Sequence, residues 1–288
     1  MRTLVTGGDG QLGRALRALF ASEGEVEAPD LDRMDVTDRR AVYAFCERFR
    51  PDLVVHAAAL TDVDGCEGDA ERAFRVNGEG ARIVAEEAAR RSARLVFVST
   101  DFVFDGAKGE AYTEEDEPNP ISVYGESKLA GERATRVLVP DAVVARTAWL
   151  YGEGGPGNFV RSILKAAGEG KDLSVVDDQH GSPTYAADAA GALLSLVRRG
   201  AKGTFHVVNA GETNRFLFAR RVLDLSGRGG VVVRPIPTSE SGRPARRPAR
   251  STLRSVRLRE AGVAPLRPWE EALAEYLARI GERKPSDV

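Results

Sequence analysis

Cysteine is scarce in this chain, which has only Cys46 and Cys66 among its 288 residues. Two cysteines can form at most one disulfide bond, which is too few to stabilise a chain of this length, so a disulfide scaffold is excluded. The sequence also lacks an excess of either charge, since 41 basic and 43 acidic side chains give a formal net charge of −2. A protein that coats nucleic acid would carry a strong basic excess, so we expect no nucleic-acid partner.

Long hydrophobic runs are absent as well. No stretch approaches the roughly 18 consecutive apolar residues of a membrane-spanning helix, so we expect no membrane partner. Residues 1–5 lead directly into glycines and not into the apolar core of a signal peptide, which predicts a cytoplasmic protein. The length suits one large domain or two closely joined domains.

The first half of the chain alternates between strand-like and helix-like segments. The strand candidates are apolar runs at 2–6, 53–56, 95–98 and 142–145, with a weaker one at 26–29. The helix candidates lie at 11–22, 38–49, 69–91 and 123–137. Continuous apolar runs are typical of buried parallel strands, so the pattern predicts an α/β fold with a Rossmann-type doubly wound parallel sheet.

The second half is less regular and predicts a smaller, interleaved C-terminal α/β domain for substrate binding. We expect a dinucleotide-binding domain at 1–150, to which 185–208 returns, and a substrate-binding domain made of 151–184 and 209–288. Within the latter, helices are expected at 159–167, 215–225 and 269–280, and an Arg/Pro segment runs from 234 to 250.

A glycine-rich turn follows the first predicted strand. Residues 6–13 read Thr-Gly-Gly-Asp-Gly-Gln-Leu-Gly, which places Gly7, Gly10 and Gly13 at the start of the first helix. The first glycine permits a tight turn, the second lets a pyrophosphate approach the backbone, and the third lets helix and strand pack closely. The turn therefore predicts a dinucleotide site with phosphates at the helix N-terminus.

The end of the second predicted strand leaves the choice of dinucleotide open. Asp30 or Asp32 could accept a hydrogen bond from a ribose 2′-hydroxyl, which favours NAD, whereas Arg33 could pair with the 2′-phosphate of NADP. Asp35 and Val36 fit an adenine-binding corner, and the alternative is that they belong to the N-cap region of the next helix.

Tyr124 and Lys128 are four residues apart, which places them on one face of a predicted helix. A neighbouring cation stabilises a phenolate, so we expect Lys128 to lower the pKa of Tyr124. The phenol could then donate a proton to a carbonyl oxygen while a hydride reaches the carbon. Thr100 ends the strand that should lie beside the nicotinamide, and its hydroxyl could bind the same oxygen.

Together these residues resemble the extended short-chain dehydrogenase/reductases and, within them, the branch of dTDP-4-dehydrorhamnose reductases. The resemblance covers nearly the whole chain. The Tyr/Lys pair is shared by the superfamily, whereas Asp-Gln-His-Gly-Ser-Pro-Thr at 178–184 and Arg-Pro-Ala at 243–245 are specific to the branch. Further matching segments lie at 10–13, 57–64, 99–106, 124–132, 146–152 and 157–159.

The resemblance implies NADPH-dependent reduction of the C4 ketone of dTDP-4-dehydro-β-L-rhamnose to dTDP-β-L-rhamnose, with NADH left open as a second cofactor. It implies Tyr124 as proton donor, with Lys128 and Thr100 as further catalytic residues. Cofactor-binding residues are expected at Gly7, Gly10, Gln11, Leu12, Gly13, Asp35, Val36, Ala59, Leu60, Thr61, Tyr124 and Lys128. Substrate-binding residues are expected at Thr61, Val63, Thr100, Asp101, Val103, Tyr124, Trp149 and Arg243.

The Arg/Pro segment has two interpretations. Its guanidinium groups suit a nucleotide diphosphate, which is why Arg243 is among the expected substrate contacts. The alternative is a solvated, proline-stiffened loop. The expected partner is a dTDP-sugar, and the protein could be a monomer or a homodimer.

Three positions depart from the pattern of the branch. Phe102 stands where a tyrosine is common, and Asn214-Arg215-Phe216 replaces a more usual Ser-Trp pair. Some relatives hold a metal through a carboxylate early in the first helix, where this chain has Arg14-Ala15-Leu16, so we predict no metal.

Related functions remain as alternatives. Phe102 cannot abstract a proton, which disfavours a dehydratase with an Asp-Glu pair after its threonine. Another nucleotide-sugar oxidoreductase or an epimerase would fit the same motifs. A non-catalytic regulator that resembles the β subunit of methionine adenosyltransferase is the third alternative.

Overall fold

The computed structural model describes residues 1–155 and 157–283. Residues 156 and 284–288 belong to the predicted substrate-binding domain and lie outside the described residues. Within the described part of the chain, no helix combines the length and the apolar character needed to cross a membrane.

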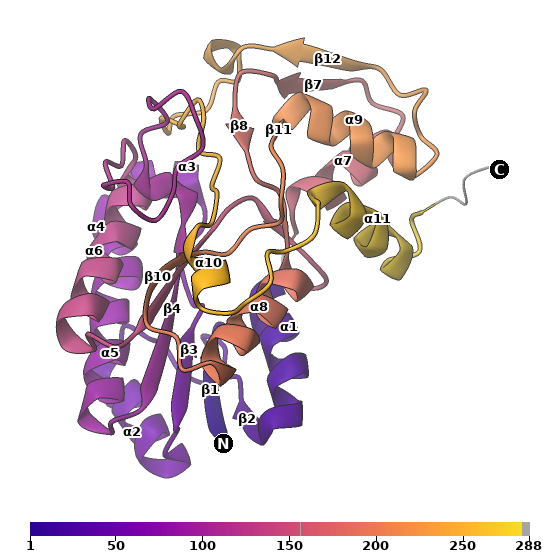
Figure 1. Ribbon diagram of the computed structural model, residues 1–288. Coiled ribbons are helices and arrows are strands. Elements are labelled where there is room, and N and C mark those ends of the chain that lie inside the picture. The colour runs from indigo at the N-terminus through magenta and orange to yellow at the C-terminus, as the bar shows by residue number, and fades with distance from the viewer. Residues whose placement is uncertain (156, 284–288) are drawn as a thin grey trace.

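A six-stranded sheet with the order β10-β5-β4-β3-β1-β2 forms the larger part of the molecule (Figure 1). Every neighbouring pair in it is parallel. The chain runs outward from β1 to β2 and then crosses back to β3, β4 and β5, so the sheet is doubly wound and the predicted fold class is confirmed. Its strands are β1 (Arg2–Thr6), β2 (Glu25–Glu27), β3 (Leu53–His56), β4 (Arg94–Thr100), β5 (Val143–Thr147) and β10 (Gly203–His206).

Helices cover both faces of this sheet (Figure 1). One face carries α1 (Gln11–Phe20) and α8 (Ala186–Arg198), and the other carries α2 (Arg39–Phe49), α5 (Gly80–Arg90) and α6 (Val123–Leu138). In α1, buried Leu12, Leu16 and Phe20 repeat every four residues, which turns one stripe of the helix toward the strands.

The predicted helix at 69–91 is interrupted. The structure has α3 (Val63–Gly68), α4 (Ala70–Phe74), a π-helical turn (Arg75–Glu79) and then α5. Asn77 lies in this turn, and its side chain accepts a hydrogen bond from the Leu60 amide and donates to the Leu60 carbonyl. A π turn inserts one extra residue into a helix, and here it accompanies a polar clamp on the loop that follows β3.

Apart from β10, the strands from residue 150 onward pair in three small sheets, two of which are labelled in Figure 1 (β7 with β12 and β8 with β11). The pairs are β6 (Leu150–Tyr151) with β9 (Thr184–Tyr185), β7 (Leu173–Val176) with β12 (Val233–Ile236), and β8 (His180–Gly181) with β11 (Thr213–Asn214). Helices α7 (Phe159–Gly168), α9 (Arg215–Leu225), α10 (Arg257–Glu260) and α11 (Trp269–Arg279) follow along the chain, with short 3₁₀ turns at Ala21–Glu23, Asp101–Val103 and Thr238–Glu240.

An aromatic cluster forms the core of these later elements. It includes Tyr151, Tyr185, Phe218, Trp269 and Tyr276, and the centroids of neighbouring rings lie 5.2–5.8 Å apart.

The Arg/Pro segment is not a loop throughout, because its first residues form β12 alongside β7. Pro235 is tolerated there because β12 lies at the edge of a two-stranded sheet.

Candidate active site

A cavity of about 960 Å³ opens at the carboxyl ends of β1, β3, β4 and β5. This is where doubly wound sheets bind their ligands, because the crossing connections leave a crevice there. The cavity is lined by the glycine turn, the loop after β3, the end of β4, the start of α6 and residues that follow β5. Every cofactor residue expected from the sequence lines it, from Gly7 through Lys128.

The glycine turn has the shape of a phosphate cradle. Gly7 adopts φ +71°, a conformation that favours glycine, and a Cβ at Gly13 would collide with the carbonyl oxygen of Gly7. Gly10 caps α1 and, having no side chain, leaves the first N–H groups of the helix free for a ligand. The turn therefore fits the pyrophosphate of NADP, with the positive end of the helix dipole facing the phosphates.

The alternatives left open at the end of β2 are separated in space. Asp30 lines the cavity, whereas Arg33 pairs with Glu27 through a 2.7 Å contact and does not line it. Asp35 and Val36 also line the cavity. The Asp35 carboxylate accepts hydrogen bonds from Thr37, and Asp38 is the residue that caps α2.

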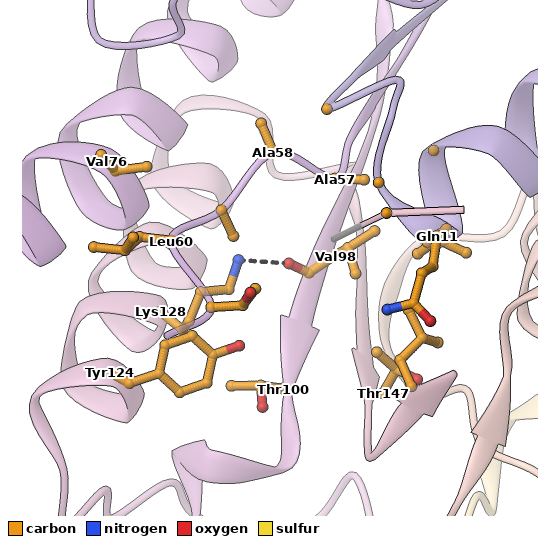
Figure 2. Close-up of a pocket in the computed structure, with 18 of the residues that line it drawn as sticks. Gln11, Ala57, Ala58, Leu60, Val76, Val98, Thr100, Tyr124, Lys128 and Thr147 are labelled. Atoms are coloured by element: carbon orange, nitrogen blue, oxygen red, sulfur yellow. Dashed lines mark hydrogen bonds between the residues drawn. The ribbon is translucent and has the colours of Figure 1, made fainter. Parts of the chain in front are cut away.

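Tyr124 and Lys128 come from the first two turns of α6, which begins after Ser122 caps it. Both side chains are buried and line the cavity, and Tyr124 lies beside Thr100 (Figure 2). Lys128 Nζ donates a 2.8 Å hydrogen bond to the carbonyl oxygen of Val98 (Figure 2). The ring of Phe102 meets that of Tyr124 edge-on, with the centroids 5.5 Å apart.

The protonation of this pair differs from our expectation. Burial raises the pKa of Tyr124 above its ordinary value of 10, and the neighbouring Thr100 hydroxyl only partly offsets this. Burial lowers the pKa of Lys128 to about 8, against the opposing charge of Glu132. The prediction that Lys128 lowers the pKa of Tyr124 is therefore wrong for this structure, and the Tyr124 hydroxyl stays protonated at neutral pH.

Asp101 follows Thr100 and is fully buried in the cavity wall. Its two oxygens accept hydrogen bonds from Ser251 at 2.5 Å and from Thr100 at 3.0 Å. Burial raises the pKa of Asp101 to about 6, although both hydroxyl groups oppose the shift. Ser251 lies 150 residues away in the sequence, and no local pattern predicted this contact.

Two expected substrate contacts do not reach the cavity. Val103 is fully buried in a separate cluster with Phe104 and Leu129, because the 3₁₀ turn after β4 directs it into the core. Arg243 is exposed and pairs with Asp64 at 2.9 Å. The remaining expected contacts, Thr61, Val63, Thr100, Asp101, Tyr124 and Trp149, do line the cavity.

Two arginines that are not among the expected substrate contacts line the cavity. Arg247 lies in the same Arg/Pro segment as Arg243 and makes a two-pronged ion pair with Asp64. Arg215 begins α9 and places its guanidinium carbon 3.6 Å from the centroid of the Trp149 ring. The departure at 214–216 was the signal that could have found Arg215.

A metal has no evident ligand set in the part of the chain that the structure describes. No group of three or more His, Cys, Asp or Glu side chains in residues 1–155 and 157–283 is placed to hold one.

Comparison with known proteins places the chain in a family. The sequence model described as the RmlD substrate binding domain matches residues 1–281. The chain belongs to the RmlD substrate binding domain family. This confirms the resemblance inferred from the motifs.

Members of the RmlD family match this chain over nearly its whole length. It is 44% identical over 284 residues to a dTDP-4-dehydrorhamnose reductase of Mycobacterium tuberculosis, covering 96% of this chain and 92% of that protein. Among solved structures, a dTDP-4-dehydrorhamnose reductase of Clostridium acetobutylicum has TM-score 0.94 and 38% identity, covering 98% of this chain and all of that one. The enzyme of the same name from Bacillus anthracis, in complex with NADP, has TM-score 0.93 and 36% identity, covering 96% and 99%.

Proposed function

We propose that this chain reduces the C4 ketone of dTDP-4-dehydro-β-L-rhamnose to the alcohol of dTDP-β-L-rhamnose with NADPH, and that NADH can take its place. One observation carries the proposal: Tyr124, Thr100 and Lys128 meet in the same cavity as the glycine turn. The full-length relatives named dTDP-4-dehydrorhamnose reductase, one of them bound to NADP, support it.

The proposed reaction needs a proton donor at the carbonyl oxygen. NADPH, when bound at the glycine turn, supplies the hydride that reduces C4. Tyr124 is protonated at neutral pH because of its raised pKa, so its hydroxyl is in the form that can give a proton to the developing alkoxide. Thr100 can hold the same oxygen by its hydroxyl, which fixes the ketone against the donor.

Lys128 has two proposed roles. It lies one turn from Tyr124, and its pKa of about 8 lets it exchange a proton near neutral pH, so it can restore the proton that Tyr124 gives up. It can also bind the ribose hydroxyls of the cofactor. Gly7, Gly10 and Gly13 would hold the pyrophosphate, and Asp35 and Val36 would hold the adenine.

We also propose how the chain divides into a cofactor-binding and a substrate-binding domain. Residues 1–150 with 185–208 form the dinucleotide-binding domain, which the position of β10 in the six-stranded sheet supports. Segments 151–184 and 209–288 form the substrate-binding domain, and Arg215 and Arg247 extend the cavity wall on that side.

The structure gives little support to the alternatives. Beside Tyr124, Phe102 offers a phenyl ring where a dehydratase would need an acid or a base. A regulator would have no need of a buried donor and lysine in an open cavity, and both are present here.

The direct test follows the ultraviolet absorbance of NADPH with dTDP-4-dehydro-L-rhamnose, in the wild type and in Tyr124→Phe. We expect Tyr124→Phe to lower kcat by roughly 10²- to 10⁴-fold, because the proton donor is lost, while the Kd for NADPH stays unchanged. Tyr43→Phe, at an exposed position, is the matched control and should behave as the wild type.

Two outcomes would contradict the proposal in different ways. A near-wild-type kcat in Tyr124→Phe would exclude Tyr124 as the donor. No oxidation of NADPH by the wild type, together with tight binding to a methionine adenosyltransferase, would favour the regulator.

A further inference from the structure

Arg215 is held in an unusual setting for a charged side chain. Its guanidinium carbon lies 3.6 Å from the centroid of the Trp149 ring and 5.1 Å from that of Phe159, so it is stacked among aromatic rings at the cavity wall. Among residues 1–155 and 157–283, its guanidinium has no hydrogen-bond partner, and the opposite charge that acts on it is that of Asp101. Arg215 is only partly buried and lines the cavity, so its N–H groups are available to an anion that enters there.

The support under Arg215 is rigid. Trp149 adopts φ +44°, the left-handed region that a bulky residue rarely occupies. Its indole packs against Gly181, where a Cβ would collide with the ring. The first turn of α9 is fixed as well, because the Asn214 side chain accepts a 2.7 Å hydrogen bond from the Leu217 amide. The Trp149 ring and the backbone that carries Arg215 are therefore fixed in place without a ligand.

Positive charge accumulates around this point. The pKa of Arg215 is lowered to about 9, chiefly by burial and also by the charges of Arg247 and Arg243, while Asp101 opposes the shift. The two other arginines share one carboxylate, since both pair with Asp64. The oxygens of Asp101 are engaged by Ser251 and Thr100. Around this end of the cavity, the three arginines are thus balanced by two carboxylates, those of Asp64 and Asp101.

We propose that Arg215 binds the diphosphate of the sugar nucleotide. The inference rests on the proposed function, because it takes the ketone to lie at Tyr124 and Thr100. In a hexose the diphosphate-bearing C1 lies across the ring from C4, so the diphosphate extends away from those two residues. A planar guanidinium presents paired N–H groups that match phosphate oxygens, and the Trp149 face leaves those groups free at the edge.

The test measures binding and not turnover. The Kd of dTDP, which has the diphosphate but no ketone, is determined by calorimetry for the wild type, Arg215→Met, Arg215→Lys and Arg215→Gln. We expect Arg215→Met and Arg215→Gln to weaken dTDP binding by roughly 10- to 100-fold, and Arg215→Lys to recover much of the loss. Arg220→Met, on the same helix, is the matched control and should leave the Kd unchanged.

A purely structural role predicts a different order. If Arg215 only packs on Trp149, the apolar methionine should bind dTDP at least as well as the lysine variant, and that result would overturn the proposal. An unchanged Kd for dTDP in Arg215→Met would overturn it too. The Kd for NADPH is also measured in each variant, because a variant that fails to fold will not bind NADPH. The dTDP affinities of the Lys and Met variants then decide between phosphate binding and packing on Trp149.

The two proposals fail separately. A wild type that reduces the ketone while the Arg215 variants bind dTDP normally would refute only the role of Arg215. A wild type that binds dTDP through Arg215 but does not oxidise NADPH would refute only the reductase.

Discussion

The six-stranded sheet with its covering helices, here called the sheet region, and the later elements around the aromatic cluster, here called the outer region, are stabilised in different ways. The sheet region shares one continuous network of main-chain hydrogen bonds between buried apolar strands. In the described part of the chain, the outer region has only two-stranded sheets, and side chains from α7, α9 and α11 fill its core.

The same difference governs how each region builds the site. The sheet region supplies its residues in short consecutive groups, such as the glycine turn and the Tyr124–Lys128 pair. The outer region supplies single residues, such as Arg215 and Arg247, that are far apart in the chain. Chemistry common to many dinucleotide enzymes thus sits on local motifs, while recognition of one substrate depends on tertiary packing.

The largest effect is expected in the sheet region, at Glu132 of α6. Glu132 is fully buried and accepts hydrogen bonds from Arg146, Arg136 and Ser99, which tie α6 to the sheet. Glu132→Gln keeps the shape and one acceptor oxygen but leaves the buried Arg146 guanidinium without a counter-charge. We expect a loss of about 3–5 kcal/mol in the free energy of unfolding, measured by urea denaturation.

Glu115→Gln is the matched control for that substitution. Glu115 pairs with Arg257 at the surface, with 66% of its side chain exposed, so we expect no change beyond about 0.5 kcal/mol. A loss at Glu132 as small as the control would mean that the main-chain network alone holds α6 to the sheet.

A middle-sized effect is expected where the two regions meet, at Asp64 of α3. Its carboxylate accepts hydrogen bonds from Arg243, Arg247 and the Ala245 amide, and the Arg247 guanidinium holds its pKa well below the usual range. Asp64→Asn should lower the free energy of unfolding by about 1–3 kcal/mol at pH 7. Because a depressed pKa stabilises the folded state only while the group is ionised, the difference from wild type should shrink as the pH falls below about 4.

Asp172→Asn provides the comparison within the outer region alone. Asp172 pairs with Arg234 at 3.3 Å, and both side chains are mostly exposed, so its loss should be within about 0.5 kcal/mol at any pH. Equal losses for Asp64→Asn and Asp172→Asn would show that the Asp64 contacts do not hold the regions together.

The comparison also explains what the sequence could predict. The strands predicted at 2–6 and 53–56 coincide with β1 and β3. A short, continuous apolar run between turns is typical of a parallel strand that is buried on both faces. The cofactor residues were predictable for the same reason, since the backbone of one short motif makes the cradle. By contrast, β12 was not expected, because Pro and Arg disfavour a strand until β7 supplies its partner.

The substrate side of the site depends on contacts that sequence spacing does not encode. Arg243 and Arg247 are four residues apart in an irregular segment and both pair with Asp64, yet Arg247 lines the cavity and Arg243 does not. Val103 belongs to a matching motif, yet a 3₁₀ turn directs it into the core. The pKa of Tyr124 could not be inferred from its spacing to Lys128, because burial and the charge of Asp101 raise it and the Thr100 hydroxyl only partly opposes them.

The smallest effect is expected at Asp30, at the edge of the sheet region, and it concerns the choice between NADPH and NADH. A carboxylate in the cavity wall accepts a hydrogen bond from a ribose 2′-hydroxyl and repels a 2′-phosphate, while Arg33 is engaged with Glu27. Asp30→Ala should therefore shift the ratio of the two Kd values toward NADPH by about five-fold, measured by fluorescence titration. Asp32→Ala, two residues away and outside the cavity wall, is the control and should leave the ratio unchanged. A shift of equal size at Asp32 would mean that net charge near β2, and not the placement of Asp30, sets the preference.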